Sequence, residues 1–382
     1  MTTTTATAAA RDIASRVLAP AAAESDKSGQ FSRKAVDALA EAHLLGLVLP
    51  RDVGGAALGP RAVADVIAAL AEADPSVAMV FLMHVLAAAT VAAAPRTPAI
   101  ERVLIDIAAG RHLSTLAFSE AGSRSHFWAP ISKAVNLNGS GVRVSAMKSW
   151  VTSAGHADSY VVSALSPEAA TATESTLYLA LAGTPGLSVA GSWDGLGLRA
   201  NASAPMRLDN CTIAADLRLT ADRAGFQAML EIVLPLFNLG QAAVSLGVCR
   251  AVVAATIAHL KNARFEHLGA SLGESLPTLR AQLATMQIET DGLAARIDDT
   301  VRHLEQPGEL TMLRVLEAKA AGGDVAISVT AAAMRACGGA AFSKHTGIER
   351  FFRDAQAGAV MAPTTDVLRE FIGKALLGLP LF

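Results

Sequence analysis

Two segments of the sequence carry side chains that could hold a flat polar ring. From Leu116 to His126 a strand end runs into a Gly/Ser-rich loop, whose hydroxyls and backbone amides can donate hydrogen bonds to a ring or a phosphate. Further on, Trp150 and Thr152 are two residues apart, which predicts that an extended strand places them on one side. A wide aromatic face beside a hydroxyl suits a planar heterocycle. An ordinary surface loop and an ordinary core tryptophan would show the same residue types.

Two segments near the C-terminus could contact a ligand through their backbone. The paired glycines Gly338 and Gly339 are predicted to end a helix, and glycine allows both a helix cap and the close approach of a ligand. Further on, Pro363 and Thr364 precede an apolar helical run, so they predict a helix N-terminus with positive dipole character and a capping hydroxyl.

The elements that must position these segments fall into three regions. Residues 1–113 show helical spacing of apolar residues and predict an N-terminal helical domain. Residues 114–222 contain short β-branched segments separated by Gly, Asn and Ser, which predict a middle β domain. Residues 223–382 return to the helical period in long stretches at about 225–266, 275–304, 308–337 and 364–377 and predict a C-terminal helical bundle. The fold class is therefore α+β and mostly helical.

The composition excludes several classes of protein. Of 382 residues 52% are hydrophobic and 17% charged, which is typical of a globular protein and excludes a disordered one. The 32 basic and 34 acidic residues form no long run, so neither nucleic acid nor an anionic membrane is expected as a partner. The cysteines, Cys211, Cys249 and Cys337, are too scattered for a disulfide framework or a metal site. The N-terminus lacks a secretory pattern, so a cytoplasmic location is expected. The apolar stretch 76–94 favours a buried core helix over a membrane span.

Several motifs occur in one order along nearly the whole chain. In this order the sequence resembles the acyl-CoA dehydrogenase superfamily. The similar segments are Pro50-Arg-Asp-Val-Gly-Gly55, Asp74-Pro-Ser76 with His84, the segments around Phe118 and Trp150, Gly195-Leu-Gly-Leu-Arg199, Ser245-Leu-Gly247 and Ile348-Glu-Arg-Phe-Phe-Arg-Asp354. The resemblance implies an N-terminal α domain, a central β-barrel-like domain and a C-terminal four-helix bundle.

The resemblance also implies FAD as the cofactor, shared with a neighbouring subunit in a homodimer or homotetramer. A long C-terminal helix that is apolar on more than one face supports such an assembly. The implied FAD contacts are Phe118, Ser119, Trp150 and Thr152 at the flavin ring, Ser125 at the pyrophosphate, Arg264, Gly338 and Gly339 toward the partner's cofactor, and Thr364 and Asp366 at the adenine half. A redox partner, an electron-transfer flavoprotein or a flavin reductase, is implied without a choice between the two.

One departure from the family concerns its catalytic base. The family's Tyr-Glu-Gly-Thr motif carries a glutamate that removes the α-proton of an acyl thioester, a task that needs a carboxylate of tuned pKa. Here Met361-Ala362-Pro363-Thr364 places Ala362 at that position. A second position used by some relatives holds Phe237, followed by Asn238 where arginine is usual. The catalytic residue is therefore unknown from the sequence.

Three functions remain open. The first is oxidation of an acyl thioester such as an acyl-CoA, with Asp366, Glu231 or His84 as a substitute base, although a cap, surface or packing role fits each of them too. The second is a flavin monooxygenase of the same fold, in which His126, Ser125 and His345 could hydrogen-bond the reacting groups. The third is a catalytically silent flavin-binding protein.

Overall fold

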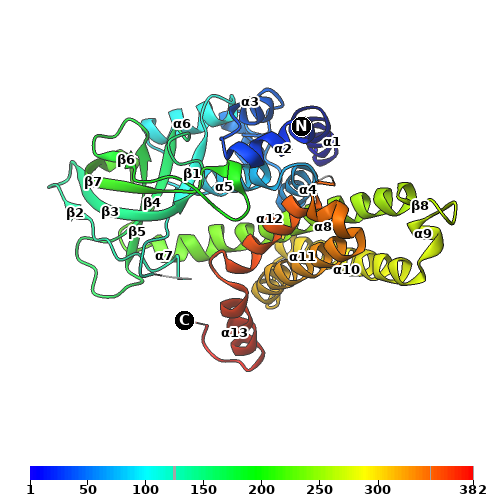
Figure 1. Cartoon of the computed structure of the whole chain (residues 1–382). Helices are drawn as coiled ribbons and strands as arrows, with labels where there is room; N and C mark the ends of the chain where they lie inside the picture. The colour runs from blue at the N-terminus through cyan, green and yellow to red at the C-terminus, as the bar shows by residue number, and fades with distance from the viewer. Residues whose placement is uncertain (124–125, 345, 382) are drawn as a thin grey trace.

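The N-terminal third of the chain is helical, as the sequence predicts (Figure 1). The computed structural model describes residues 1–123, 126–344 and 346–381. The first helices are α1 (Thr3–Ile13), α2 (Ala19–Ser28), α3 (Arg33–Glu41), α4 (Pro60–Ala71), α5 (Pro75–Ala92) and α6 (Pro98–Ala108), with a π-helical turn at Ala14–Leu18 between α1 and α2. Helix α5 begins where the Asp74 carboxylate accepts hydrogen bonds from the amides of Ser76 (2.9 Å) and Val77 (3.4 Å). Pro75 fits the first helical position because no N–H donor is needed there.

The middle of the chain forms two sheets. The strands are β1 (Ser114–Ala117), β2 (Val135–Asn136), β3 (Gly141–Val151), β4 (Ser159–Leu165), β5 (Ser175–Leu181), β6 (Leu187–Val189) and β7 (Ala204–Ala214). One sheet has the order β1-β4-β5, with β1 parallel to β4 and β4 antiparallel to β5, and the other has the antiparallel order β2-β3-β7-β6. The predicted hairpin loop at 165–176 lies between β4 and β5.

The last third is again helical. Its elements are α7 (Gly225–Ala228), α8 (Leu234–Asn262), β8 (Arg264–Phe265), β9 (Ala270–Ser271), α9 (Leu272–Ser275), α10 (Pro277–Glu305), α11 (Thr311–Phe342), α12 (Ile348–Val360) and α13 (Thr365–Leu376). Two predicted boundaries are wrong. The helix expected to reach Glu266 ends at Asn262, because residues 264–265 pair with 270–271 as a hairpin. Helix α11 does not end at the paired glycines: it kinks at Gly338 (φ 52°, ψ −130°) and continues to Phe342.

The most apolar helices pack inside the molecule. Three helical stretches, 75–92, 225–262 and 311–342, are long and apolar enough to cross a membrane by length and composition. In the first two, 83% of the most apolar window is buried against other parts of this protein, in agreement with the core helix expected at 76–94. The third is only 44% buried, so α11 keeps much of its apolar surface uncovered within one chain. All three cysteines are buried free thiols.

His84 connects the helical domain to the first strand and is not available as a base. Its Nε2–H donates to the carbonyl oxygen of Leu45 (2.9 Å), and its Nδ1 accepts from the amide of Ser114 (3.0 Å), so both ring nitrogens are in use by a neutral imidazole. Burial lowers the pKa of His84 to about 4.

We expect His84 to make the fold sensitive to acid. The unfolded chain gains a proton on this residue below its ordinary pKa of 6.5, whereas the folded chain does not until about pH 4, so stability is lost as the pH falls through this window. The His84→Phe variant should be less stable at pH 7.5 by about 2 kcal/mol, because the Ser114 amide and the Leu45 carbonyl lose a partner. Its unfolding free energy should also depend less on pH between 6.5 and 4, by up to about 3 kcal/mol. Urea titrations of both proteins across this range test this; parallel pH curves would contradict it.

Candidate active site

The two segments expected at the flavin ring lie side by side in the β domain. After β1 the chain pairs with the end of β3: the amide of Ser149 donates to the carbonyl oxygen of Ser119 (2.8 Å), and Glu120 pairs with Lys148. Ser119 and Trp150 are therefore neighbours across this pairing. The Phe118 ring is buried and stacks at 6.3 Å on Phe127.

Trp150 and Thr152 do not share one side of a regular strand, contrary to the period-two expectation. The register of β3 against β7 shifts between Lys148 and Val151, and Trp150 has a positive φ of 56°. Because this irregularity breaks the alternation of side chains, the Trp150 indole is 66% exposed while Thr152 is buried. The indole packs edge-to-face on Trp193 at 5.8 Å, and the Thr152 hydroxyl lies 3.1 Å from that of Ser203. An exposed, supported indole at a strand end is a surface that a planar ligand would cover.

Trp150→Ala should weaken flavin binding. The variant removes the exposed indole at the end of β3 without changing a buried side chain. Loss of an aromatic contact of about 1–1.5 kcal/mol corresponds to roughly tenfold weaker FAD binding. Reconstitution of the apoprotein, followed by flavin fluorescence, measures the affinity, and Trp193→Phe, which keeps an aromatic ring beneath position 150, is the matched control. Unchanged affinity in Trp150→Ala would show that this indole is ordinary surface.

Other residues implied to contact the cofactor lie outside the β domain that carries Ser119 and Trp150. Arg264 is exposed in the β8–β9 hairpin, where it donates to the Gly269 carbonyl oxygen (2.8 Å), and Figure 1 shows this hairpin at the end of the molecule opposite the β domain. The Gly338–Gly339 pair is open, since a Cβ added to either glycine would meet nothing within 4 Å. These positions fit the expected contact with a partner's cofactor, which stays a prediction. Ser125 lies outside the described residues.

The turn between α12 and α13 holds the position where the family's glutamate is expected. Ala362 is partly exposed, and Thr364 caps α13 by accepting from the Val367 amide (3.4 Å). Asp366 follows in the first turn with its side chain 93% exposed and an ion pair to Arg369 at 3.5 Å. Behind the turn the buried ammonium of Lys319 donates to the carbonyl oxygens of Met361 and Pro363 and to that of Gly358 in α12. Burial lowers the Lys319 pKa to about 7. Sequence reasoning missed Lys319, although one lysine inside an Ala-rich helix is a visible signal.

None of the proposed substitute bases is suitable. His84 has both nitrogens engaged, and Asp366 points to solvent. Glu231 is exposed and accepts from the Gln227 side chain (2.9 Å). At the second base position, the Phe237 ring centroid lies 5.8 Å from Lys319 Nζ. Phe237 and the turn that carries Ala362, the two places where the sequence predicts the family's base, therefore both lie next to Lys319, and neither Ala362 nor Phe237 is a carboxylate.

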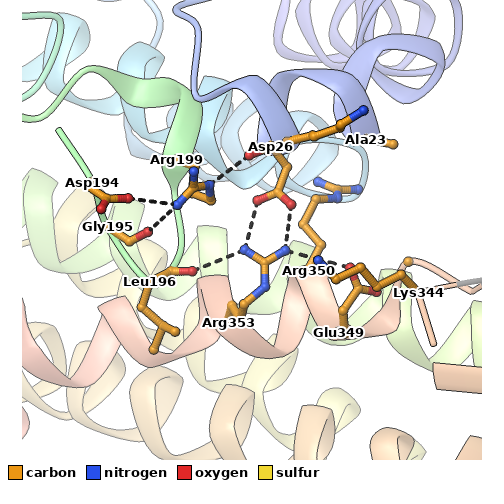
Figure 2. A pocket seen from close by; sticks show the side chains of 12 residues that line it. Ala23, Asp26, Asp194, Gly195, Leu196, Arg199, Lys344, Glu349, Arg350 and Arg353 are labelled. Carbon is orange, nitrogen blue, oxygen red and sulfur yellow. Dashed lines mark hydrogen bonds and ion pairs between the residues drawn. The ribbon is translucent and has the colours of Figure 1, made fainter. Parts of the chain in front are cut away.

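A cavity lies elsewhere, where the three domains meet. It has a volume of about 790 Å³ and is lined by α2, the 194–199 turn and the start of α12 (Figure 2). Arg353 closes one side with a two-pronged contact to Asp26 (2.9 and 2.5 Å) and a hydrogen bond to the Leu196 carbonyl oxygen (3.1 Å). These ion pairs join the domains, so the cavity is a structural junction.

The same junction explains two motifs of the sequence. A Cβ atom at Gly197 would lie 2.5 Å from the Arg353 carbonyl oxygen, so only glycine lets this turn approach α12. The next amide, of Leu198, donates to the Asp354 carboxylate (2.6 Å). Burial raises the pKa of Asp354 to about 7. The Gly-Leu-Gly-Leu-Arg and Arg-Asp motifs therefore hold the domains together.

Comparison with known proteins covers the chain from end to end. Residues 3–111, 115–211 and 223–377 match the family models described as acyl-CoA dehydrogenase N-terminal, middle and C-terminal domain. Cyclohex-1-ene-1-carbonyl-CoA dehydrogenase of Geobacter metallireducens is 25% identical over 370 residues, which is 96% of either chain. Butyryl-CoA dehydrogenase of Megasphaera elsdenii has the same fold, with a TM-score of 0.92, 21% identity and 98% of each chain covered. The prolyl acyl carrier protein oxidase AnaB is also similar, with a TM-score of 0.89, 19% identity and 99% of each chain covered.

Proposed function

The chain belongs to the acyl-CoA dehydrogenase superfamily, and on this premise we propose that it oxidises an acyl thioester or a related small substrate without a carboxylate base from position 362 or 237. Its cofactor is FAD, as the sequence led us to expect. Bound FAD would supply a two-electron acceptor. The observation that carries the proposal is the exposed Trp150 indole beside the Ser119–Ser149 pairing, together with Ala362 and Phe237 at the positions where a base is expected.

The residues present fit a flavin. The exposed Trp150 indole offers a flat apolar face, and the pairing of Ser119 with Ser149 fixes the backbone beside it. The kink at Gly338 leaves an open backbone surface that no described side chain of this chain covers. A planar ring with a phosphate-bearing tail needs both kinds of surface.

The missing carboxylate restricts the substrates. An ordinary saturated acyl group must lose an acidic α-proton, and this chain offers no positioned carboxylate for that step among the described residues near the turn. A carbon bonded to nitrogen is different, because the nitrogen lone pair stabilises the carbon as its hydrogen leaves with both electrons; the remaining N–H proton then departs to water. Acyl groups that carry an amine next to the thioester are therefore the favoured substrates. The similarity to a prolyl carrier protein oxidase supports this choice.

A flavin monooxygenase is the second candidate, since hydroxylation by reduced flavin and oxygen needs no base at position 362. The structure offers His126 for this role: its ring is exposed and stacks on Trp128 at 5.1 Å. Ser125 and His345, the other residues considered for it, lie outside the described residues. A catalytically silent flavin-binding protein is the third candidate function.

Two measurements on the FAD-loaded protein separate these functions. Under anaerobic conditions the flavin should be bleached by a prolyl or another α-aminoacyl thioester faster than by butyryl-CoA. The photoreduced protein is then mixed with oxygen and a phenol or an amine, and the products are analysed for hydroxylation. Bleaching by the aminoacyl thioester would support the proposal, and a hydroxylated product would support the monooxygenase. The absence of both bleaching and hydroxylation would support the silent protein.

We also propose that the protein works as a homodimer or homotetramer. Large apolar side chains remain exposed on the C-terminal helices, among them Phe342 (83%), Leu377 (75%) and Ile288 (71%). Such surface is costly to leave in water. Sedimentation of the FAD-loaded protein should therefore give a mass of at least twice 39.2 kDa. A stable monomer that retains its flavin would contradict this expectation.

A further inference from the structure

Half of the buried side-chain atoms that lack a hydrogen-bond partner in the described part of the chain lie in one region of the C-terminal bundle. Eight such atoms are found there and elsewhere, and four of them belong to Asn238, Gln241 and Thr365. Asn238 contributes Oδ1 and Nδ2, Gln241 contributes Oε1, and Thr365 contributes its hydroxyl oxygen. All three residues are buried, Asn238 completely. Native proteins rarely bury polar groups without a partner, so this polar cluster calls for an explanation.

The packing of four helices brings the polar cluster together. Asn238 and Gln241 are three residues apart in α8 and therefore share one face of that helix. Helix α11 packs against α8, α12 and α13. A Cβ added to Gly358 in α12 would lie 3.2 Å from Gln241 Nε2. A Cβ added to Gly323 in α11 would lie 3.1 Å from Thr365 Oγ1 and 3.4 Å from the Gly358 carbonyl carbon. Gln241 and Thr365 thus lie on either side of the contact between α11 and α12.

The polar cluster adjoins both places where a base is expected. Asn238 follows Phe237 in α8, and Thr365 lies three residues after Ala362. On the proposed function, the acyl group of the substrate lies next to these two places and therefore next to the cluster. Because the family usually has arginine at position 238, the buried amide there is a departure of this chain from its relatives.

The polar cluster needs an occupant that donates hydrogen bonds and carries no charge. The side-chain oxygens of Asn238 and Gln241 only accept hydrogen bonds, and a hydrocarbon chain would leave them unpaired. A cation is disfavoured because the Lys319 ammonium is near: its Nζ lies 3.3 Å from the carbonyl oxygen of Gly358, the residue beside Gln241. A neutral amine meets both conditions.

We propose that Asn238 and Gln241 are specificity-determining residues, whose side-chain oxygens accept hydrogen bonds from the N–H of a neutral α-amino group on the acyl thioester. The assignment rests on the proposed function and deepens it. The lone pair of the amine stays free to support removal of the hydrogen from the neighbouring carbon. An acyl group without the amine leaves both amides unpaired, so the residues that favour an aminoacyl group also disfavour an ordinary one.

Three thioesters with one carbon skeleton test the recognition: butyryl-CoA, 2-aminobutyryl-CoA and 2-hydroxybutyryl-CoA. Their binding is measured by anaerobic calorimetric titration of the photoreduced, FAD-loaded protein, because reduced flavin cannot oxidise the ligand. The titration is made at about pH 8.5, where an α-amino group is largely neutral. The natural protein should bind the amino compound at least about tenfold more tightly than butyryl-CoA, as one or two additional hydrogen bonds would give.

Two variants assign this preference to the polar cluster. Asn238→Leu keeps the size of the side chain and Gln241→Met keeps its length, and each should lose most of the preference for the amino compound. A preference that survives in both variants would overturn the inference, as would tighter binding of the hydroxy compound than of the amino compound. Binding of all three thioesters without preference would overturn it too, while oxidation of an acyl thioester would stand. If the natural protein binds none of them, the proposed function fails and the amine assignment fails with it.

Unfolding without substrate tests whether the Asn238 amide lacks a partner in the folded protein. Asn238→Leu should then raise the urea midpoint of the FAD-loaded protein, because an apolar group of similar shape replaces a buried, unpaired amide. Asn201→Leu is the matched control: Asn201 is also buried, but its Oδ1 accepts from the Ser203 amide (3.0 Å), so its loss should lower the midpoint. A lower midpoint in Asn238→Leu would show that the amide belongs to the packing and would overturn the inference. If Asn238→Leu does not fold, the same measurement on Gln241→Met decides.

Discussion

Butyryl-CoA should bleach the flavin of the Ala362→Glu/Pro363→Gly double variant faster than that of the natural protein, by up to about 10²–10⁴-fold. This range is what a positioned general base contributes. The natural turn offers no carboxylate, and His84, Asp366 and Glu231 cannot replace one.

The single variant Ala362→Glu should gain less than the double variant. Pro363 restricts the backbone dihedral φ next to the new carboxylate, so the carboxylate is aimed less freely, and an error of about 1 Å can cost about 10²-fold in rate. Ala362→Gln/Pro363→Gly is the matched control, because it has the same shape and no basic oxygen. Anaerobic stopped-flow bleaching with a chain-length series of acyl-CoAs gives the rates. Rapid, stoichiometric bleaching of the natural protein by butyryl-CoA would show that a base exists elsewhere.

The helices and the family could be predicted from the sequence because their signals are local. Asp74 and Pro75 mark the start of α5 by chemistry that acts within three residues. The exposure of Trp150 could not be predicted in this way. It depends on a shift in register against β7, a strand some 55 residues later in the chain, and the local alternation of residues carries no trace of that shift.

The charged residues inside the molecule were missed for a similar reason. Lys319 and the turn that it holds are separated by about 40 residues, and its partners are backbone carbonyls, which have no signature in the sequence. The expectation that position 362 lacks the family's base, in contrast, comes from a motif of four residues and stays a prediction. Short motifs can thus predict a catalytic position, whereas the residues that would support it become apparent only from the packing.

A buried ion pair next to Phe118 and Ser119, which are expected to contact the flavin, illustrates such support. Lys148 Nζ donates to Glu120 Oε1 (2.6 Å) and to the carbonyl oxygens of Ser163 (2.6 Å) and Phe118 (3.3 Å). The other oxygen of Glu120 accepts from the amides of residues 131 (3.1 Å) and 132 (2.9 Å). Burial by itself would raise the pKa of Glu120, but Lys148 and the hydrogen bonds from Ser132 lower it overall, so the carboxylate stays ionised. The pair thus ties the chain after β1 to β3, β4 and the loop that returns at residue 131.

Lys148→Met should destabilise the protein by about 3–5 kcal/mol and release FAD, because it leaves the Glu120 carboxylate buried without its cation. The side chains of the pair are only 0% and 5% exposed, so water cannot replace the lost partner without opening the sheet. The Glu120→Gln/Lys148→Met double variant should lose less than the single variant, since no charge is then buried. Urea unfolding followed by circular dichroism, with flavin fluorescence as the second signal, measures both effects. Two outcomes would contradict this expectation: a loss below about 1 kcal/mol in Lys148→Met, or a double variant no more stable than the single one. Either outcome would mean that another group compensates the charge of Glu120 and that the ion pair does not hold the segments at Phe118 and Ser149 together.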